Sequence, residues 1–139
     1  YKLVFNKIGK DKSSKCSILS SHSNDEIYGA VYNISESDSI ILDSFEGIGY
    51  DRKNLQVNMK GKNIEVYTYI AHPDHTDEKL KPFTWYKDLI VLGGRFHKFP
   101  NSYINKIDSY PSISDPDLNR QVKIDSLILG IKSYAHDEY

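Results

Sequence analysis

The chain has 139 residues, 39% hydrophobic and 27% charged, which is enough for one globular domain over residues 1–139 and too short for two. Its 18 basic and 19 acidic side chains leave a net charge of -1, which argues against nucleic acid and anionic membranes as partners. The apolar runs are too short to span a bilayer, and Cys16 alone allows no internal disulfide, so we expect a cytoplasmic protein.

The first part of the chain is expected to form strands. Short apolar or alternating runs cover residues 2–8, 15–20 and 26–33, and polar segments rich in turn residues separate them. In the third run the apolar side chains occupy both alternating sets of positions, which is typical of a strand that is covered on both faces. We therefore expect the third strand to lie in the centre of a sheet.

The middle of the chain predicts a helix followed by a hairpin. After Ser35 the apolar residues recur at three- and four-residue spacing, which predicts a helix over residues 36–45 with Ser35 as its N-cap. Gly47 is expected to end this helix as its C-terminal cap. Strands over residues 50–58 and 63–71, joined by a tight turn, should follow.

The last part of the chain is expected to be helical. Thr84 can cap a helix that runs from Trp85 to about Lys98, and a second helix begins at Pro100. A third helix should start near Pro116 and run toward Gly130. Strands first and helices last predict an α+β fold, in which a small mixed or antiparallel, barrel-like sheet carries one inserted helix and C-terminal helices.

Glu46, at the end of the first predicted helix, is the candidate for proton transfer. The negative end of the helix dipole and the apolar neighbours Phe45 and Ile48 both favour the uncharged form of its carboxyl group. A general acid or base that works near neutral pH needs such a group. The residues alone also fit a solvated carboxylate at a helix end, and that alternative stays open.

Several blocks in chain order resemble one known family. They are Glu-Ile-Tyr-Gly-Ala-Val-Tyr at 26–32, Leu-Asp-x-x-Glu-Gly-x-Gly-Tyr-x-Arg at 42–52, Tyr-Thr-Tyr at 67–69 and Trp-Tyr-Lys-Asp-Leu-Ile-x-x-Gly at 85–93. Phe-Pro-x-x-Tyr-Ile at 99–104 and Asp-Pro-Asp at 115–117 continue the series. Each block alone is weak evidence, but the series in register resembles the gamma-glutamylcyclotransferase family, including its AIG2-like relatives.

The resemblance implies an enzyme that converts a γ-glutamyl amide to 5-oxoproline. In this family the substrate's own α-amino group attacks its γ-carbonyl, closes a five-membered lactam and expels an amine or amino acid. The resemblance implies that Glu46 carries the proton from the α-ammonium group to the leaving nitrogen. The reaction requires neither a metal nor a cofactor, and the substrate is a small molecule.

The same resemblance implies substrate-binding residues around Glu46. Tyr69 matches a family residue whose hydroxyl lies in the substrate cavity, and Tyr50 matches another aromatic residue of that cavity. Gly47 follows the catalytic Glu and lets the backbone approach a ligand closely. For both tyrosines the structural alternative is a strand residue with a buried ring and a hydrated hydroxyl group.

One family feature does not occur in this sequence. Family members begin with a strand that leads into a Tyr-Gly-Ser-Asn/Leu loop, whose backbone N–H groups hold the substrate carboxylate and the developing oxyanion. Residues 1–5 match the segment after that loop. We therefore expect the chain to lack an N-terminal strand and loop, either as a shortened form of a longer protein or as a degenerate member with little activity.

Other candidate sites have simpler interpretations. His72 and His75 have an H-x-x-H spacing, but Pro73 predicts a solvated loop there instead of a metal site. Cys16 is expected to be a small packed side chain and not a nucleophile. The lysines between Lys7 and Lys15 predict a solvated hairpin edge.

Two functional hypotheses follow. The first is a gamma-glutamylcyclotransferase-like enzyme, an acyl-transferring lyase with Glu46 as acid and base. The second is a non-catalytic module of the same fold that binds a small anionic or γ-glutamyl-bearing ligand, or a partner protein. The intact Glu46, Tyr50 and Tyr69 favour the first hypothesis, and the missing loop favours the second. The sequence identifies neither the amine leaving group nor the oligomeric state.

Overall fold

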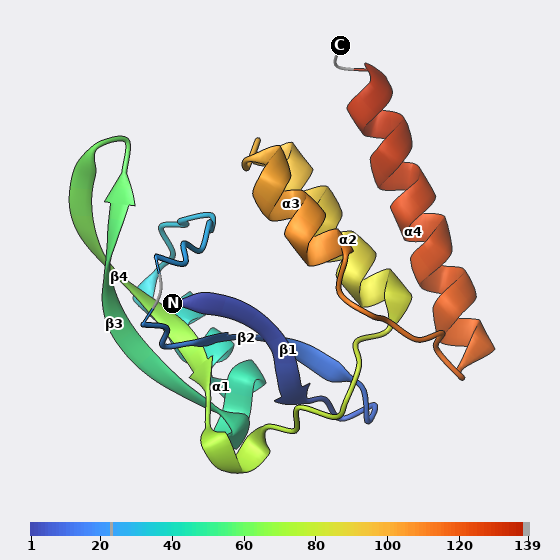
Figure 1. Cartoon of the computed structure of the whole chain (residues 1–139), viewed down its shortest axis with the longest axis horizontal. Coiled ribbons are helices and arrows are strands. Elements are labelled where there is room, and N and C mark those ends of the chain that lie inside the picture. Colours follow the sequence, from blue (N-terminus) through green and yellow to red (C-terminus); the bar gives the residue numbers. More distant parts are fainter. Residues whose placement is uncertain (23, 138–139) are drawn as a thin grey trace. The chain divides into compact units, whose positions relative to one another are not determined.

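The computed structural model describes residues 1–22 and 24–137, with side chains up to residue 133. The chain divides into two compact units, Tyr1–Leu80 and Lys81–Tyr139. The first unit holds the strands and one helix, and the second holds the remaining helices (Figure 1). The predicted α+β class is therefore confirmed. The single domain expected from chain length stays a prediction.

The N-terminal unit begins with an antiparallel hairpin. Strands β1 (Lys2–Ile8) and β2 (Ser14–Leu19) pair along their lengths, close to the predicted bounds. Val4 and Phe5 are buried on this hairpin. Among the described residues the strands form two two-stranded sheets, where the sequence suggested a single barrel-like one.

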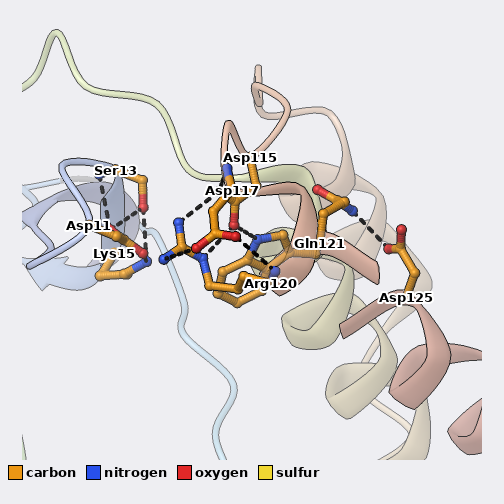
Figure 2. Close-up of polar contacts among 9 residues, drawn as sticks. Asp11, Ser13, Lys15, Asp115, Asp117, Arg120, Gln121 and Asp125 are labelled. Atoms are coloured by element: carbon orange, nitrogen blue, oxygen red, sulfur yellow. Dashed lines mark hydrogen bonds and ion pairs between the residues drawn. The ribbon is translucent and has the colours of Figure 1, made fainter. Parts of the chain in front are cut away.

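The edge of this hairpin is less exposed than the sequence predicted. The turn between β1 and β2 is closed by Asp11, which accepts hydrogen bonds from the Ser13 backbone and hydroxyl at 3.1 and 2.8 Å. Asp11 also forms an ion pair with Lys15 at 2.7 Å (Figure 2). Lys7 and Lys15 are partly buried, while Lys10 and Lys12 are exposed, as expected of a solvated hairpin edge.

The predicted helix and second hairpin are confirmed. Helix α1 (Glu36–Glu46) has Ser35 as its N-cap, where the side chain accepts a hydrogen bond from the Asp38 N–H at 3.1 Å. After a short 3-10 turn, strands β3 (Tyr50–Met59) and β4 (Lys62–Ala71) form the long twisted hairpin in Figure 1.

The prediction of a central strand over residues 26–33 is wrong. Residues 24–35 lie outside any strand, and the side chains of Tyr28, Val31 and Tyr32 are 38%, 48% and 71% exposed. Alternating apolar residues give a central strand only where a neighbouring strand supplies ladder partners on each side. Within the described residues, the ladder of each hairpin is internal, and the one bridge that β1 makes outside its hairpin goes to Thr76, so this segment has no ladder.

The C-terminal unit consists of α2 (Thr84–Phe96), α3 (Asn101–Asp108) and α4 (Leu118–Asp137). Thr84 does not cap α2, because the N-cap is Phe83. The Thr84 hydroxyl lies instead within hydrogen-bond distance of the Ser112 hydroxyl, at 3.1 Å, and of the Ile113 carbonyl, at 3.2 Å. Helix α4 continues beyond Gly130, where the sequence predicted its end. A glycine inside a helix is unfavourable but tolerated. The core of this unit contains the buried Phe83, Val91, Ile104, Ile107 and Ile128.

Two buried charged residues hold the C-terminal unit together. The Lys87 ammonium donates to the carbonyls of Asp108 and Tyr110, at 2.7 and 3.1 Å, and so satisfies the C-terminal end of α3. Asp115 is 3% exposed and accepts two hydrogen bonds from Arg120, at 2.5 and 2.7 Å (Figure 2). No helix in the described part of the chain is long and apolar enough to span a bilayer.

Candidate functional site

Glu46 is the last residue of α1 and is partly buried. Gly47 follows with φ 62°, in the left-handed region that favours glycine, and its N–H donates to the carbonyl of Asp43. The predicted C-terminal cap is therefore confirmed. A helix that stops at Glu46 fixes the backbone of this residue beside the turn that follows.

That turn is the 3-10 segment Gly47–Gly49, which leads directly into β3 at Tyr50. The carbonyl of the buried Gly49 accepts a hydrogen bond from the His72 N–H at 3.0 Å. His72 precedes a second 3-10 turn, Pro73–His75, at the end of β4. The backbone after β4 therefore holds the glycine turn next to Glu46.

One face of the β3–β4 hairpin carries the aromatic residues of the site. Tyr50 pairs with Ala71, and Arg52 pairs with Tyr69. Cross-strand partners and residues two apart share a face, so these four side chains and Tyr67 lie on the same side of the hairpin. The rings of Tyr67 and Tyr69 meet edge to face, with centroids 6.0 Å apart.

Helix α1 contacts this face through Asp43. The hydroxyl of Tyr69 donates a hydrogen bond to the Asp43 carboxylate, and Arg52 donates to the other carboxylate oxygen at 3.1 Å. Asp43 lies three residues before Glu46, so the two carboxylates occupy neighbouring positions on one side of the helix. Tyr69 is thus bound one helical turn from Glu46.

A second set of contacts centres on Ser39, the buried residue of α1. Its hydroxyl accepts a hydrogen bond from Arg52 at 2.8 Å and lies 3.3 Å from the Tyr67 hydroxyl, which donates to it. The Arg52 guanidinium stacks over the Tyr67 ring, 3.7 Å from its centroid. Arg52 therefore positions α1, and with it Glu46, against the hairpin.

The Asp43–Tyr69 contact changes the acidity of both groups. Burial, together with the hydrogen bond and negative charge of Asp43, raises the pKa of Tyr69 to about 12. The hydrogen bonds from Tyr69 and Arg52 lower the pKa of Asp43, against the opposing effect of burial. At neutral pH Asp43 is ionised and Tyr69 keeps its proton, so Tyr69 can donate a hydrogen bond but cannot act as a base.

Tyr50 is bound to the first hairpin. Its hydroxyl donates to the carbonyl of Cys16 at 3.3 Å, and the Lys7 ammonium lies 5.0 Å from the centre of its ring. The ring therefore lies between β2 and Lys7 and is partly buried. Burial raises the pKa of the Cys16 thiol to about 12, so the thiol stays protonated at neutral pH.

Comparison with known proteins gives the family. The sequence profile of the AIG2-like family matches residues 26–107, more than half of the chain. The chain belongs to the AIG2-like family. No curated protein sequence matches this AIG2-like chain.

Two solved structures share the fold of the AIG2-like chain. One, described as gamma-glutamyl cyclotransferase, has a TM-score of 0.77 at 20% identity, over 93% of this chain and 79% of its own. The other, uncharacterized protein loc79017 from Homo sapiens, has a TM-score of 0.75 at 22% identity, over 91% and 78%. The fold of this AIG2-like protein is that of gamma-glutamyl cyclotransferase.

The structure brings the predicted site residues of the AIG2-like protein to one end of α1 and one face of the β3–β4 hairpin. Glu46 and Gly47 end the helix, Tyr69 contacts it through Asp43, and Tyr50 begins the strand after the glycine turn. Sequence reasoning assigned no role to Asp43, Arg52 or Lys7. The spacing of Asp43 and Glu46 was a usable signal, because residues three apart share a helix side.

Two further features of the AIG2-like protein are a pair of histidines after β4 and a groove in the C-terminal unit. The rings of His72 and His75 have centroids 6.1 Å apart, and Nδ1 of His72 accepts a hydrogen bond from the Asp74 N–H at 3.3 Å. In the described part of the chain, no group of three or more His, Cys, Asp or Glu side chains could hold a metal ion. A groove of about 480 Å³ in the C-terminal unit is lined by Arg95, Lys98, Phe99, Pro100, Asn101 and Ile104.

Proposed function

We propose that this AIG2-like protein is a gamma-glutamylcyclotransferase-type enzyme that converts a γ-glutamyl amide to 5-oxoproline and a free amine or amino acid. The observation that carries the proposal is the position of Glu46. Its partly buried carboxylate ends α1, next to the Gly47–Gly49 turn, and interacts electrostatically with Lys7. A partly buried carboxylate beside a glycine turn suits a proton carrier in a small site.

In the proposed reaction the two reacting groups belong to one substrate molecule. The Glu46 carboxylate accepts a proton from the substrate's α-ammonium group, and the freed nitrogen attacks the γ-carbonyl carbon. A new C–N bond closes the lactam ring and the original amide C–N bond breaks. Glu46 passes the two protons that the attacking nitrogen loses, one after the other, to the leaving nitrogen. The protein mainly holds the substrate in a folded conformation, which lowers the entropic part of the barrier.

The tyrosines have supporting roles in this proposal. Tyr69 keeps its proton at neutral pH and is fixed by Asp43, one helical turn from Glu46, so it orients the substrate without exchanging a proton. Tyr50 forms a side wall of the site with its ring, since its hydroxyl is engaged by Cys16. The close approach of a ligand to the turn depends on Gly47, where no side chain stands in the way.

A non-catalytic binding module is the second candidate function. The observation that favours it is that the hydroxyls of Tyr50 and Tyr69 donate to groups of the protein itself. Such tyrosines brace the fold and leave fewer donors for an oxyanion. In that case the same end of α1 binds a small anionic or γ-glutamyl-bearing ligand, or a partner protein, without turnover.

The two functions are separated by one assay. The full-length protein is incubated with glutathione, a γ-glutamyl dipeptide and a γ-glutamylamine, and 5-oxoproline is measured by mass spectrometry. The enzyme proposal predicts release from at least one of the three compounds. Calorimetric binding of these compounds without any release would instead support the binding module.

The cellular setting is also part of the proposal. Cys16 is the single cysteine of the chain, so the chain can form no internal disulfide. We propose the cytoplasm as its compartment, because proteins without disulfides are typical of reducing compartments. The near-neutral net charge of -1 supports a small-molecule substrate over nucleic acid or a membrane surface.

A further inference from the structure

The groove of about 480 Å³ in the C-terminal unit lies where α2 ends and α3 begins, two helices that pack against each other (Figure 1). The residues that line it come from the last turn of α2, the short connection and the first turn of α3. None of them belongs to the site around Glu46. A volume of this size is typical of pockets that bind small molecules.

Both charged residues that line the groove are basic. They are Arg95 and Lys98, and both are exposed. Within the part of the chain that the structure describes, their side chains form neither an ion pair nor a hydrogen bond. The sequence has no acidic residue between Asp88 and Asp108, although the chain as a whole carries a net charge of -1. Two cations without a counter-charge attract an anion to the groove.

The start of α3 adds uncharged donors at the edge of the same groove. The N-cap of α3 is Pro100, which provides no side-chain hydrogen bond to the first N–H groups of the helix. Asn101, the next residue, also lines the groove, and its exposed side chain carries an amide N–H group. These donors supplement the two cations, and groups of both kinds bind phosphate oxygens.

The apolar part of the groove is tightly packed around Phe99. The Phe99 ring stacks with that of His97 at a centroid distance of 5.9 Å and meets Tyr103 edge to face at 6.2 Å. A Cβ atom on Gly94 would lie 3.4 Å from both Phe99 and Ile104, so the two helices approach each other closely here. The Phe99 ring is therefore held in place, and its partly exposed surface can support the ring of a ligand.

Lys98 occupies a backbone position that favours glycine. Its φ is 55°, and its N–H donates to the Arg95 carbonyl at 3.0 Å while the Phe99 N–H donates to the Gly94 carbonyl at 2.9 Å. These two hydrogen bonds end α2 in a motif that usually has glycine at the place of Lys98. The turn therefore does not account for a lysine here, whereas a groove that binds an anion does.

We propose that this groove binds a small phosphate ester, with Arg95 and Lys98 holding the phosphate group and Phe99 supporting a ring of the organic part. A guanidinium group matches two phosphate oxygens, and the second cation balances the second negative charge that a phosphate monoester carries near neutral pH. The inference goes beyond the proposed cyclotransferase function and does not rest on it, because every residue involved belongs to the C-terminal unit.

Calorimetry on the full chain with three probes tests the proposal. Phenyl phosphate carries the charge and the ring, inorganic phosphate carries only the charge, and phenol carries only the ring. Phenyl phosphate should bind most tightly, inorganic phosphate about tenfold more weakly, and phenol without measurable affinity. A failure to bind phenyl phosphate at millimolar concentration overturns the proposal, and so does phenol binding as tight as that of phenyl phosphate.

Two variants test the cations. Arg95→Gln should weaken the binding of phenyl phosphate and of inorganic phosphate by about tenfold or more. Lys98→Gly removes the other charge and also relieves the positive φ, so its melting temperature should equal or exceed that of the wild type while binding weakens by a similar factor. Wild-type affinity in a folded Lys98→Gly overturns the proposal.

Lys123→Met is the matched control for charge. Lys123 is an exposed lysine of α4 that does not line the groove, so this variant should bind both phosphates like the wild type. If Lys123→Met weakens binding as much as Arg95→Gln does, the attraction is unspecific and the proposal is wrong. Tighter binding of a hexaglutamate peptide than of phenyl phosphate also overturns it, because the groove would then suit an acidic protein segment.

Phe99→Leu tests the support for the ring. The variant keeps an apolar side chain at this place and removes its flat surface. It should bind inorganic phosphate with wild-type affinity and lose most of the preference for phenyl phosphate. If the preference is unchanged while the affinity for inorganic phosphate stays that of the wild type, the role assigned to Phe99 is wrong.

Discussion

The hydroxyl of Tyr69 donates a hydrogen bond to the carboxylate of Asp43, which connects β4 to α1 one helical turn from Glu46. Tyr69 was expected from the family resemblance to face a ligand, and the structure shows that its proton is already engaged. A tyrosine held in this way is a rigid part of the site. Its position, and that of Glu46, depend on the same carboxylate.

Titration of Tyr69 tests this contact. Its pKa of about 12 arises from burial and from the hydrogen bond and charge of Asp43. Asp43→Asn removes the charge, so the pKa of Tyr69 should fall toward the ordinary value of about 10. The measurement is phenolate absorbance against pH, with the Tyr69→Phe curve subtracted to isolate this residue. An unchanged midpoint in Asp43→Asn would show that the contact is not formed in solution.

Acid should destabilise the C-terminal unit through Asp115. Hydrogen bonds from Arg120, with that residue's positive charge, hold the pKa of Asp115 well below its usual range. Because the folded-state pKa is depressed, the stabilisation is complete above the unfolded value of about 3.9 and is lost as pH falls below it.

Urea unfolding at a series of pH values measures this effect. Asp115→Asn should reduce stability at pH 7 and flatten the acid slope, while the exposed Asp51→Asn should leave both unchanged. Some slope will remain, because the pKa values of Asp11 and Asp43 are lowered as well. A full acid slope in Asp115→Asn would contradict the assignment.

Replacing Lys87 should destabilise the C-terminal unit. Lys87 is 8% exposed and satisfies the carbonyls of Asp108 and Tyr110. Lys87→Met keeps the apolar stem but leaves those carbonyls without their donor, at a cost of about 1–3 kcal/mol in the free energy of unfolding. Lys123→Met, on the exposed side of α4, is the matched control and should unfold like the wild type. Equal stability of the two variants would count against the structural role of Lys87.

Two glycine-to-alanine changes should act in opposite directions. Gly47 has φ 62° and open space around it, so Gly47→Ala meets only backbone strain and should cost about 1–2 kcal/mol. Gly93 lies inside α2, also with open space, so Gly93→Ala should stabilise the protein by up to about 1 kcal/mol. Thermal unfolding of both variants measures the difference, and a stabilising Gly47→Ala would show that the helix does not end there.

The sequence predicted the elements whose signals are local. Ser35 and Gly47 bracket α1 through contacts within a few residues, and Gly61 at the turn between β3 and β4 has φ 82°. The prediction of a strand at 26–33 was wrong because a strand depends on partners distant in sequence, and alternation alone does not supply them. Thr84 failed as a cap because Ser112 and Ile113 bind its hydroxyl, again from far along the chain.

The candidate site was predictable only in part for the same reason. Glu46, Gly47, Tyr50 and Tyr69 came from motifs in register with a family. Motifs could not predict the position of the Lys7 side chain, because a bulge in β1 and the bridge to Thr76 set its direction. No local spacing in β1 indicates that this lysine, and not its neighbours, reaches the glycine turn.

The most direct test of the central claim is 5-oxoproline release by Glu46→Gln. The substitution keeps the shape of the side chain and removes its capacity to carry a proton, so release should fall by about a hundredfold or more while thermal unfolding stays that of the wild type. Glu65→Gln, on the exposed face of β4, should keep full activity. Wild-type turnover by Glu46→Gln would contradict the account, because the proton would then have another carrier.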